Sequence, residues 1–364
     1  MCMKGFISHG RSGSDLKAHL VLTTKYRRQV FTDAKKMKNT KRVKIVALDI
    51  GPDYWNQIRD GLVAKGVSCE VTTVEPICLL DTSPIAEINM LRQALRKEKE
   101  EVSVFLPFTT ELFLEEPDFI IMFSGYRSMY EPDRLKIIPC VWPLPTNVSD
   151  LKGIKWTNKP ELSVGFLGAS YESRKIVKLA AYLPKFLKQQ LLQGRHLKYV
   201  YTSHQKKLPI LLARMPSFVR TEVLTKLKAT TLKTDVTLHS YTRTSEEKKN
   251  YQNHMLRNTY IFCPRGFENF SYRFYEALAY GRIPVLIDTD TVLPPNVNWD
   301  ELCVRVPYEK ISELEKIIRI DYETKTERDF IERQEKALKV IEDLKKMSWL
   351  EDIIEEIAKA AQHR

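Results

Sequence analysis

Apolar and polar positions follow two successive patterns of short strands and amphipathic helices. In the first part of the chain, strand-like runs lie at 43–50, 68–75, 117–123 and 135–145, and helical spacing occurs at 53–65 and 84–99. Runs that are apolar throughout, such as 43–50, are typical of parallel strands covered on both faces. We therefore expect a parallel α/β lobe over residues 41–150.

A second series follows the polar stretch 147–159, which we interpret as a linker. Strand-like runs lie at 162–168, 197–202, 235–240 and 259–264, and helical spacing lies at 172–192, 207–228 and 245–257. We expect a second α/β lobe over 151–320 and further helices over 321–364. The predicted fold class is α/β, with two Rossmann-like lobes facing a cleft and ligands bound beyond the carboxyl ends of the strands.

The block 262–288 carries the clearest chemistry in the chain. It predicts a strand, a basic glycine turn, a helix at 270–280 and a second strand at 282–287. The helix N-terminus and its surroundings hold Arg265, Gly266, Ser271, Arg273 and Glu276. Unpaired N–H groups and arginines suit phosphate oxygens, a glycine lets the backbone approach an anion, and a carboxylate accepts ribose hydroxyls. These residues predict a binding site for the diphosphate and ribose of a nucleotide sugar.

A structural interpretation of the same helix competes with this one. Arg273 and Glu276 are three residues apart, the spacing of an ordinary ion pair on a helix surface. Taken alone, the pair favours the structural interpretation. The preceding CPRG turn and the following GRIPVL strand favour the binding site.

Beyond these physical arguments, the block resembles the signature of exostosin-like glycosyltransferases. That signature combines a CPRG turn, a serine, an arginine, E-A-L, a glycine and I-P-V, and the aspartate, leucine-proline and tryptophan that follow match Asp288, Leu293-Pro294 and Trp299. The upstream stretch 159–174 is similar to the family's strand-glycine-helix segment, so that the resemblance covers about 159–305. It implies a GT-B-like fold and an inverting transferase that uses a nucleotide-activated sugar, UDP-linked by our expectation, without a divalent metal.

The upstream stretch supplies a second glycine turn. Gly165 and Gly168 end a strand-like run, and Arg174 follows in the next predicted helix. A plain strand-to-helix turn would look the same, because two glycines at this spacing are a weak signal. Together with the resemblance, the pattern adds Gly168 and Arg174 to the predicted donor-binding residues.

A metal site is the alternative at the end of the block. Asp288, Thr289 and Asp290 form an Asp-x-Asp after an apolar strand, and two carboxylates could bridge a divalent cation to a diphosphate. The cations predicted beside the phosphates would make that metal redundant. We therefore expect no metal cofactor, with Arg265 and Arg273 stabilising the leaving diphosphate.

The expected reaction is displacement at the anomeric carbon of the donor by a hydroxyl of a saccharide or glycolipid acceptor. A carboxylate of the first lobe would take the proton. Asp49, at the end of the first strand, is our first candidate for this base; Asp53, Glu75 and the turn 124–127 are others, and Asp53 also suits a helix N-cap. Two alternatives are a fucosyltransferase-like enzyme that uses GDP-fucose and a non-catalytic nucleotide-sugar-binding protein.

The net charge of +12 is concentrated in the first 44 residues. These hold twelve basic and two acidic residues, whereas the other 320 hold 46 and 44, so the charge does not indicate a nucleic-acid partner. We interpret 1–40 as a disordered or remnant arm, which would suit peripheral contact with anionic lipid. Residues 15–31 resemble a fragment of a small insertion-sequence transposase, but the chain has no His-x-His pair for that chemistry.

Six scattered cysteines without a C-x-x-C pair predict reduced thiols and no zinc site. No apolar run reaches the ~18–20 residues of a membrane-spanning helix, and no signal-peptide pattern opens the sequence. We expect a cytoplasmic protein, with peripheral contact on the inner membrane face as the further expectation.

Overall fold

The structure is a computed structural model of the 364-residue chain. It describes residues 42–48, 54–74, 93–95, 101–108, 117–127, 130–141, 144, 154–169, 218–238, 244–266 and 269–362. The arm 1–40, the predicted helix 172–192 and the predicted strand 197–202 lie outside these residues. So do Asp49, Asp53, Glu75 and Arg174.

The N-terminal lobe is built on a parallel five-stranded sheet. Its strands have the order β2-β1-β3-β4-β5, and α2 (Tyr54–Ala64) connects the first two. The strands are β1 (Arg42–Leu48), β2 (Cys69–Val74), β3 (Glu101–Phe108), β4 (Phe119–Met122) and β5 (Leu135–Ile137). Apolar side chains of β1, β3 and β4 are buried on both faces, as the continuous apolar runs predict.

The C-terminal lobe repeats this topology. Its parallel sheet has the order β10-β9-β8-β6-β7, which again runs 2-1-3-4-5 in chain order. The strands are β6 (Ser163–Gly168), β7 (Lys233–Leu238), β8 (Tyr260–Cys263), β9 (Ile283–Asp288) and β10 (Val304–Pro307). The helices are α8 (Phe218–Lys228), α9 (Ser245–Arg257), α10 (Tyr272–Ala279) and α11 (Leu314–Thr324), with 3₁₀ turns at Trp299–Glu301 and Tyr308–Glu313. The α/β, GT-B-like fold class is thereby confirmed.

Helices cover the C-terminal sheet on both faces. Apolar residues of α8 and α11 form one core with Phe166, Phe262 and Val285, whereas α9 and α10 pack with Ile261 and Cys263 on the other face. Neighbouring residues of one strand therefore point to opposite layers, as a doubly covered sheet requires.

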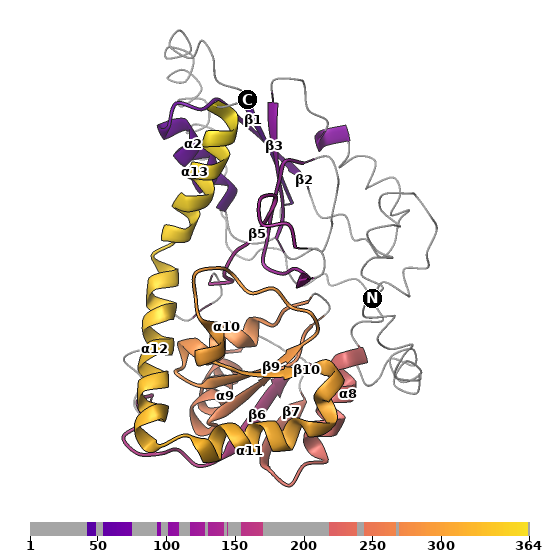
Figure 1. Ribbon diagram of the computed structural model, residues 1–364, viewed down its shortest axis with the longest axis vertical. Coiled ribbons are helices and arrows are strands. Elements are labelled where there is room, and N and C mark those ends of the chain that lie inside the picture. Colours follow the sequence, from indigo (N-terminus) through magenta and orange to yellow (C-terminus); the bar gives the residue numbers. More distant parts are fainter. Residues whose placement is uncertain are drawn as a thin grey trace.

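The last two helices join the lobes. In Figure 1, α12 (Glu327–Lys345) runs along the C-terminal lobe and α13 (Ser348–Gln362) reaches α2 of the N-terminal lobe. Gly61 of α2 lies against Ile354 of α13, and ion pairs join Lys65 to Glu355 and Lys136 to Glu356. None of the described helices is long and apolar enough to cross a membrane.

Two strands were not predicted from the hydrophobic pattern. β3 follows directly on a charged stretch and contains Pro107, and both features argue against a central strand. The structure accommodates Pro107, which has no N–H to donate, within a register shift between Phe105 and Phe108 opposite β4. β10 is only four residues long. The predicted run 135–145 was too long, because β5 ends at Ile137.

Candidate functional site

The C-terminal sheet changes its winding direction between β6 and β8. The chain passes from β6 to β7 on one side, then returns to place β8 on the other side of β6 and continues outward to β9 and β10. In parallel sheets of this kind ligands bind at the carboxyl ends of the two strands that flank such a switch point. Here those ends are Gly168 of β6 and Cys263 of β8.

β6 emerges at the surface at this edge. Its first four residues are buried, Leu167 and Gly168 are half-buried, and Ala169 is exposed. The signature block supplies the other side, because α10 follows β8 directly. The residues predicted to bind a donor, as far as the structure describes them, therefore lie near one edge of one sheet.

Arg273 of α10 reaches the end of β6. Its Nη2 donates to the carbonyl of Leu167 at 2.6 Å, and its guanidinium lies 4.5 Å from the ring centroid of Phe166. A Cβ at Gly168 would lie 2.3 Å from this Nη2, so that only glycine leaves room for the arginine. The buried Nε has no hydrogen bond, and Arg273 forms no ion pair with any described residue. Among the described carboxylates, Glu276 interacts with the charge of Arg273, but beyond ion-pair distance.

Glu276 lies one turn further along α10. Its Oε2 accepts a hydrogen bond from the hydroxyl of Tyr251 of α9. Burial raises the pKa of Glu276, and the hydrogen bond from Tyr251 and the charge of Arg273 oppose this rise. Burial also raises the pKa of Tyr251, so its hydroxyl remains a donor. Within the described part of the chain Oε1 has no hydrogen-bond partner, which leaves an acceptor oxygen beside Arg273.

Arg265 differs from its predicted placement. It is 2% exposed, and it donates from Nη1 to Oδ1 of Asn269 at 3.2 Å and from Nη2 to the hydroxyl of Tyr126 at 3.3 Å. Tyr126 belongs to the N-terminal lobe, so Arg265 points into the junction between the lobes. Arg265 points there because the junction supplies polar partners for its guanidinium. One of these partners, Asn269, also donates to the carbonyl of Gly125 at 3.0 Å.

Gly266 and Ser271 complete the turn before α10. The N–H of Gly266 donates to the carbonyl of Phe270 at 3.0 Å, so this amide already has an acceptor inside the turn. Ser271 occupies the N-cap position of α10, and its side chain makes no capping hydrogen bond. It is 7% exposed. The predicted backbone contact of Gly266 with an anion is therefore not preformed.

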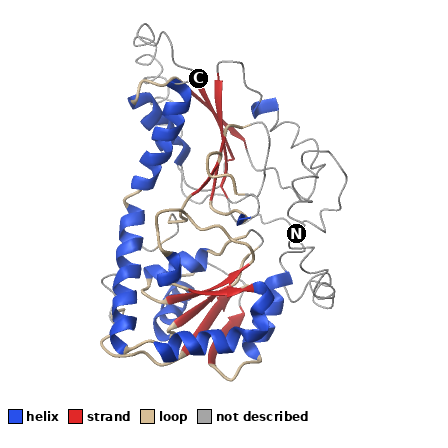
Figure 2. Ribbon diagram, viewed as in Figure 1, coloured by secondary structure: helices blue, strands red, loops and turns tan. Residues whose placement is uncertain are grey.

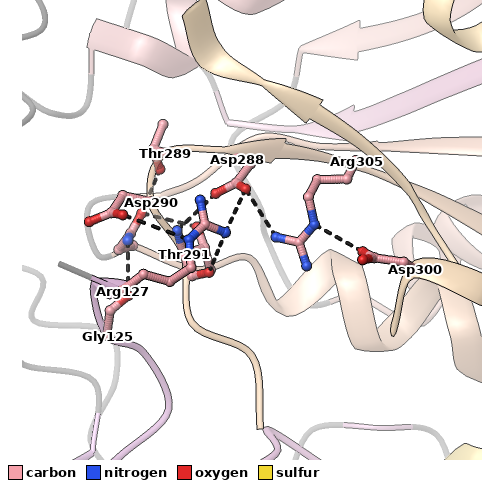
Figure 3. A network of polar contacts seen from close by, with 9 residues as sticks. Gly125, Arg127, Asp288, Thr289, Asp290, Thr291, Asp300 and Arg305 are labelled. Carbon is pink, nitrogen blue, oxygen red and sulfur yellow. Dashed lines mark hydrogen bonds and ion pairs between the residues drawn. The ribbon is translucent and has the colours of Figure 1, made fainter. Parts of the chain in front are cut away.

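Asp288 is engaged with two arginines rather than left open for a metal ion. Its Oδ2 accepts from Arg127 at 2.8 Å and from Arg305 at 3.0 Å, and its Oδ1 accepts from the N–H of Thr291 at 2.9 Å (Figure 3). Burial alone would raise the pKa of Asp288, but the hydrogen bonds and the charges of Arg127 and Arg305 lower it. The described residues contain no group of three potential metal ligands.

The same contacts bring the carboxyl edges of the two sheets together. Tyr126 follows β4 and forms an antiparallel bridge with Thr291, which follows β9, and the N–H of Arg127 donates to the carbonyl of Asp290 at 2.9 Å. Figure 2 shows loops from both lobes meeting between the two sheets. The turn 124–127, considered for the catalytic base, contains no carboxylate and serves this junction.

Four further residues of the candidate site were not predicted to act there. Tyr251, Tyr126 and Arg220 contact Glu276, Arg265 and the turn after β6, respectively, and Asn269 contacts Arg265. Asn269 could have been noticed, since it lies inside the signature block. Tyr251, Arg220 and Tyr126 lie 25, 51 and 139 residues from their partners along the chain, and no local pattern connects them to those partners, although Tyr126 lies in the turn 124–127 considered for the base.

Comparison with known proteins concerns the lobe that carries this site. Residues 165–320 match the family model described as the Exostosin GT47 domain. The C-terminal lobe is thus similar to exostosin domains. The chain is 37% identical over 76 residues to a probable glucuronosyltransferase of Oryza sativa subsp. japonica, and 46% identical over 48 residues to ribitol-5-phosphate xylosyltransferase 1 of Homo sapiens. These alignments cover 20% and 13% of this chain and only 18% and 11% of the two relatives.

Solved structures show a weaker likeness that extends over more of this chain. A glycosyltransferase of Rickettsia africae matches 89% of this chain and 99% of its own with a TM-score of 0.40 and 8% identity. Anabaena HepE in complex with UDP and glucose matches 87% of this chain and 99% of its own with a TM-score of 0.37 and 14% identity. The assignment of the C-terminal lobe rests on the sequence match.

Proposed function

We propose that this protein is a glycosyltransferase that moves a sugar from a nucleoside diphosphate to a saccharide or glycolipid acceptor. One observation carries the proposal: within the segment that matches the Exostosin GT47 domain, Arg273 places a cation at the switch point of a doubly wound sheet, and no described residue forms an ion pair with it. Glu276, one turn away, offers an acceptor oxygen for the ribose hydroxyls.

The proposed reaction is a single displacement with inversion. The acceptor oxygen forms a bond to the anomeric carbon while the bond from that carbon to the diphosphate oxygen breaks. The acceptor's proton passes to a carboxylate, for which Asp49 remains our candidate because it directly follows β1. β1 and β3 flank the switch point of the N-terminal sheet. Negative charge that develops on the leaving diphosphate is stabilised by Arg273.

No divalent metal is required in this proposal. The oxygens of Asp288 already accept hydrogen bonds from two arginines and one backbone N–H, so a metal ion at the Asp-x-Asp would have to displace them. The donor is a UDP-sugar in our first expectation, because the two relatives named above are called glucuronosyl- and xylosyltransferases. GDP-fucose is the alternative donor.

A donor panel in metal-free buffer tests this proposal. Purified protein is incubated with UDP-glucuronic acid, UDP-xylose, UDP-glucose and GDP-fucose, each with EDTA, and release of the nucleoside diphosphate is measured with and without saccharide acceptors. We expect release from one donor, lost in Arg273→Ala and Glu276→Ala and retained in the control Arg328→Ala, whose side chain is 87% exposed on α12. Release that needs added Mn²⁺, or that survives Arg273→Ala, would contradict the proposal.

A further inference from the structure

Arg220 joins the two strands that flank the switch point. It is the third residue of α8 and is half-buried. Its Nε donates to the carbonyl of Arg265 at 3.0 Å, and its Nη1 donates to the carbonyl of Ala169 at 3.3 Å. Ala169 directly follows β6, and Arg265 follows β8 by two residues. One guanidinium therefore bonds the backbone on both sides of the place where this fold binds ligands.

Arg220 and Arg273 belong to helices on opposite faces of the sheet, and Arg273 extends its guanidinium over Phe166, on the face that α8 covers. Val219 of α8 belongs to the core with Phe166, whereas Phe274 of α10 belongs to the core with Ile261 on the other face. Arg273 bonds the carbonyl of Leu167 and Arg220 that of Ala169. The two carbonyls are two residues apart, so the two cations hold the same turn.

A glycine makes room for each guanidinium. A Cβ at Gly168 would lie 2.3 Å from Nη2 of Arg273, and a Cβ at Gly266 would lie 3.3 Å from Nη2 of Arg220. The first distance is excluded for a real Cβ and the second is tight. Since the N–H of Gly266 already donates to Phe270, close approach of Arg220 is the role that the structure leaves to this glycine.

We propose that Arg220 and Arg273 are the two cations that bind the diphosphate of the donor, and that Arg265 is a positioning residue. This inference rests on the proposed function, whose site it completes. Arg265 supplies its carbonyl to Arg220 and its guanidinium to Tyr126 and Asn269. Two phosphates bound between the two guanidiniums would receive forked, charge-assisted hydrogen bonds from both arginines.

Binding of inorganic pyrophosphate and of UDP, GDP and uridine, measured by calorimetry in metal-free buffer, tests this pairing. We expect Arg220→Ala and Arg273→Ala each to weaken pyrophosphate and nucleoside diphosphate binding about tenfold or more, as for a lost charge-assisted hydrogen bond. Uridine binding should stay unchanged. Lys226→Ala, which removes an exposed cation from the same helix, is the matched control and should bind as the wild type does.

Two further variants separate binding from structural support, since Arg220→Ala also removes hydrogen bonds from two carbonyls. Arg220→Gln keeps an N–H donor without the charge, and Arg220→Lys keeps the charge. Because we expect affinity to follow charge, the Arg220→Lys variant should retain more pyrophosphate binding than Arg220→Gln. The salt dependence of binding should flatten in Arg220→Gln alone. Equal affinity in both, matching the wild type, would overturn the role of Arg220.

The outcomes also separate this inference from the proposed function. If Arg273→Ala loses UDP or GDP binding and no Arg220 variant does, the pairing is wrong while the donor site stands. If pyrophosphate binds through both arginines but no nucleoside diphosphate binds, the pairing stands and the donor proposal fails. Wild-type protein that binds neither pyrophosphate nor a nucleoside diphosphate would contradict both.

Discussion

Arg127 of the N-terminal lobe donates from Nη1 to Oδ2 of Asp288 in the C-terminal lobe at 2.8 Å. Asp288 is 4% exposed in its side chain, whereas that of Arg127 is 52% exposed. The second arginine on the same oxygen, Arg305, also pairs with Asp300. A buried carboxylate thus links the two lobes at the point where the carboxyl edges of their sheets meet.

Replacing the carboxylate should harm stability more than replacing its exposed partner. We expect Asp288→Asn to lower the free energy of unfolding by about 2–3 kcal/mol, because both arginines lose their anion at a buried carboxyl position. Arg127→Ala should cost at most about 1 kcal/mol, as for an exposed ion pair. Denaturant unfolding measures both, and an Arg127→Ala variant less stable than Asp288→Asn would contradict this order.

The lowered pKa of Asp288 gives that variant a pH signature. A carboxylate whose folded pKa lies below its unfolded value stabilises the protein above the unfolded pKa, about 3.9, and loses this contribution as the pH falls through the folded value. The stability difference between wild type and Asp288→Asn should therefore be constant near neutral pH and shrink below about pH 4. A difference that grows on acidification would contradict the pairing.

Gly168→Ala should mimic Arg273→Ala. The added Cβ would lie 2.3 Å from Nη2 of Arg273 and would force the guanidinium off the carbonyl of Leu167. We expect about tenfold weaker nucleoside diphosphate binding in either single variant and no further loss in the double variant, because both remove the same contact. Additive losses, measured by calorimetry, would show that the two residues act independently.

Glu276→Gln should separate binding from stability. Because burial raises the pKa of Glu276, folding disfavours its ionised form, and stability falls as the pH rises from the unfolded to the folded pKa. At neutral pH the glutamine variant should be at least as stable as the wild type. Its donor affinity should fall several-fold, because an amide oxygen is a weaker acceptor than a carboxylate. A variant that loses stability but keeps its affinity would indicate a structural role for Glu276.

Gly61→Ala tests the docking of α13 on α2. Alanine favours the helix by about 1 kcal/mol, but its Cβ would lie 2.6 Å from Cδ1 of Ile354, and overpacking costs about 1–3 kcal/mol. We expect a net loss of about 1 kcal/mol in the wild-type background. With Ile354→Val, which removes Cδ1, the same substitution should become neutral or stabilising. If Gly61→Ala remains destabilising in the Ile354→Val background, as measured by denaturant unfolding, close packing of the two helices would be contradicted.

Local patterns predicted the elements whose ends are set locally. Helix α9 was predicted at its observed bounds, and the structure adds a capping box formed by Thr244 and Glu247 at its start. Strand β3 escaped prediction because its neighbours in sequence are charged and its proline is accommodated by a register shift against β4. That accommodation depends on strand pairing, which a one-dimensional pattern does not contain.

The candidate site likewise combines features that local sequence patterns predict with features that depend on long-range contacts. The spacing of Arg273 and Glu276 on one helix is local, and it placed both residues on α10 near the switch point. The direction of Arg265 depends on Tyr126, which is 139 residues away, and the contacts of Arg220 span 45 and 51 residues. The signature block therefore predicted which segment forms the candidate site, while long-range contacts determine which of its arginines face the proposed binding edge.

The central claim is that a nucleoside diphosphate binds at the carboxyl ends of β6 and β8 through Arg273. Calorimetric titration of UDP and GDP into wild-type protein, Arg273→Ala and the control Arg328→Ala, all with EDTA, measures this directly. We predict that one nucleotide binds the wild type and Arg328→Ala equally and binds Arg273→Ala at least about tenfold more weakly. Equal binding to a folded Arg273→Ala variant would contradict the account.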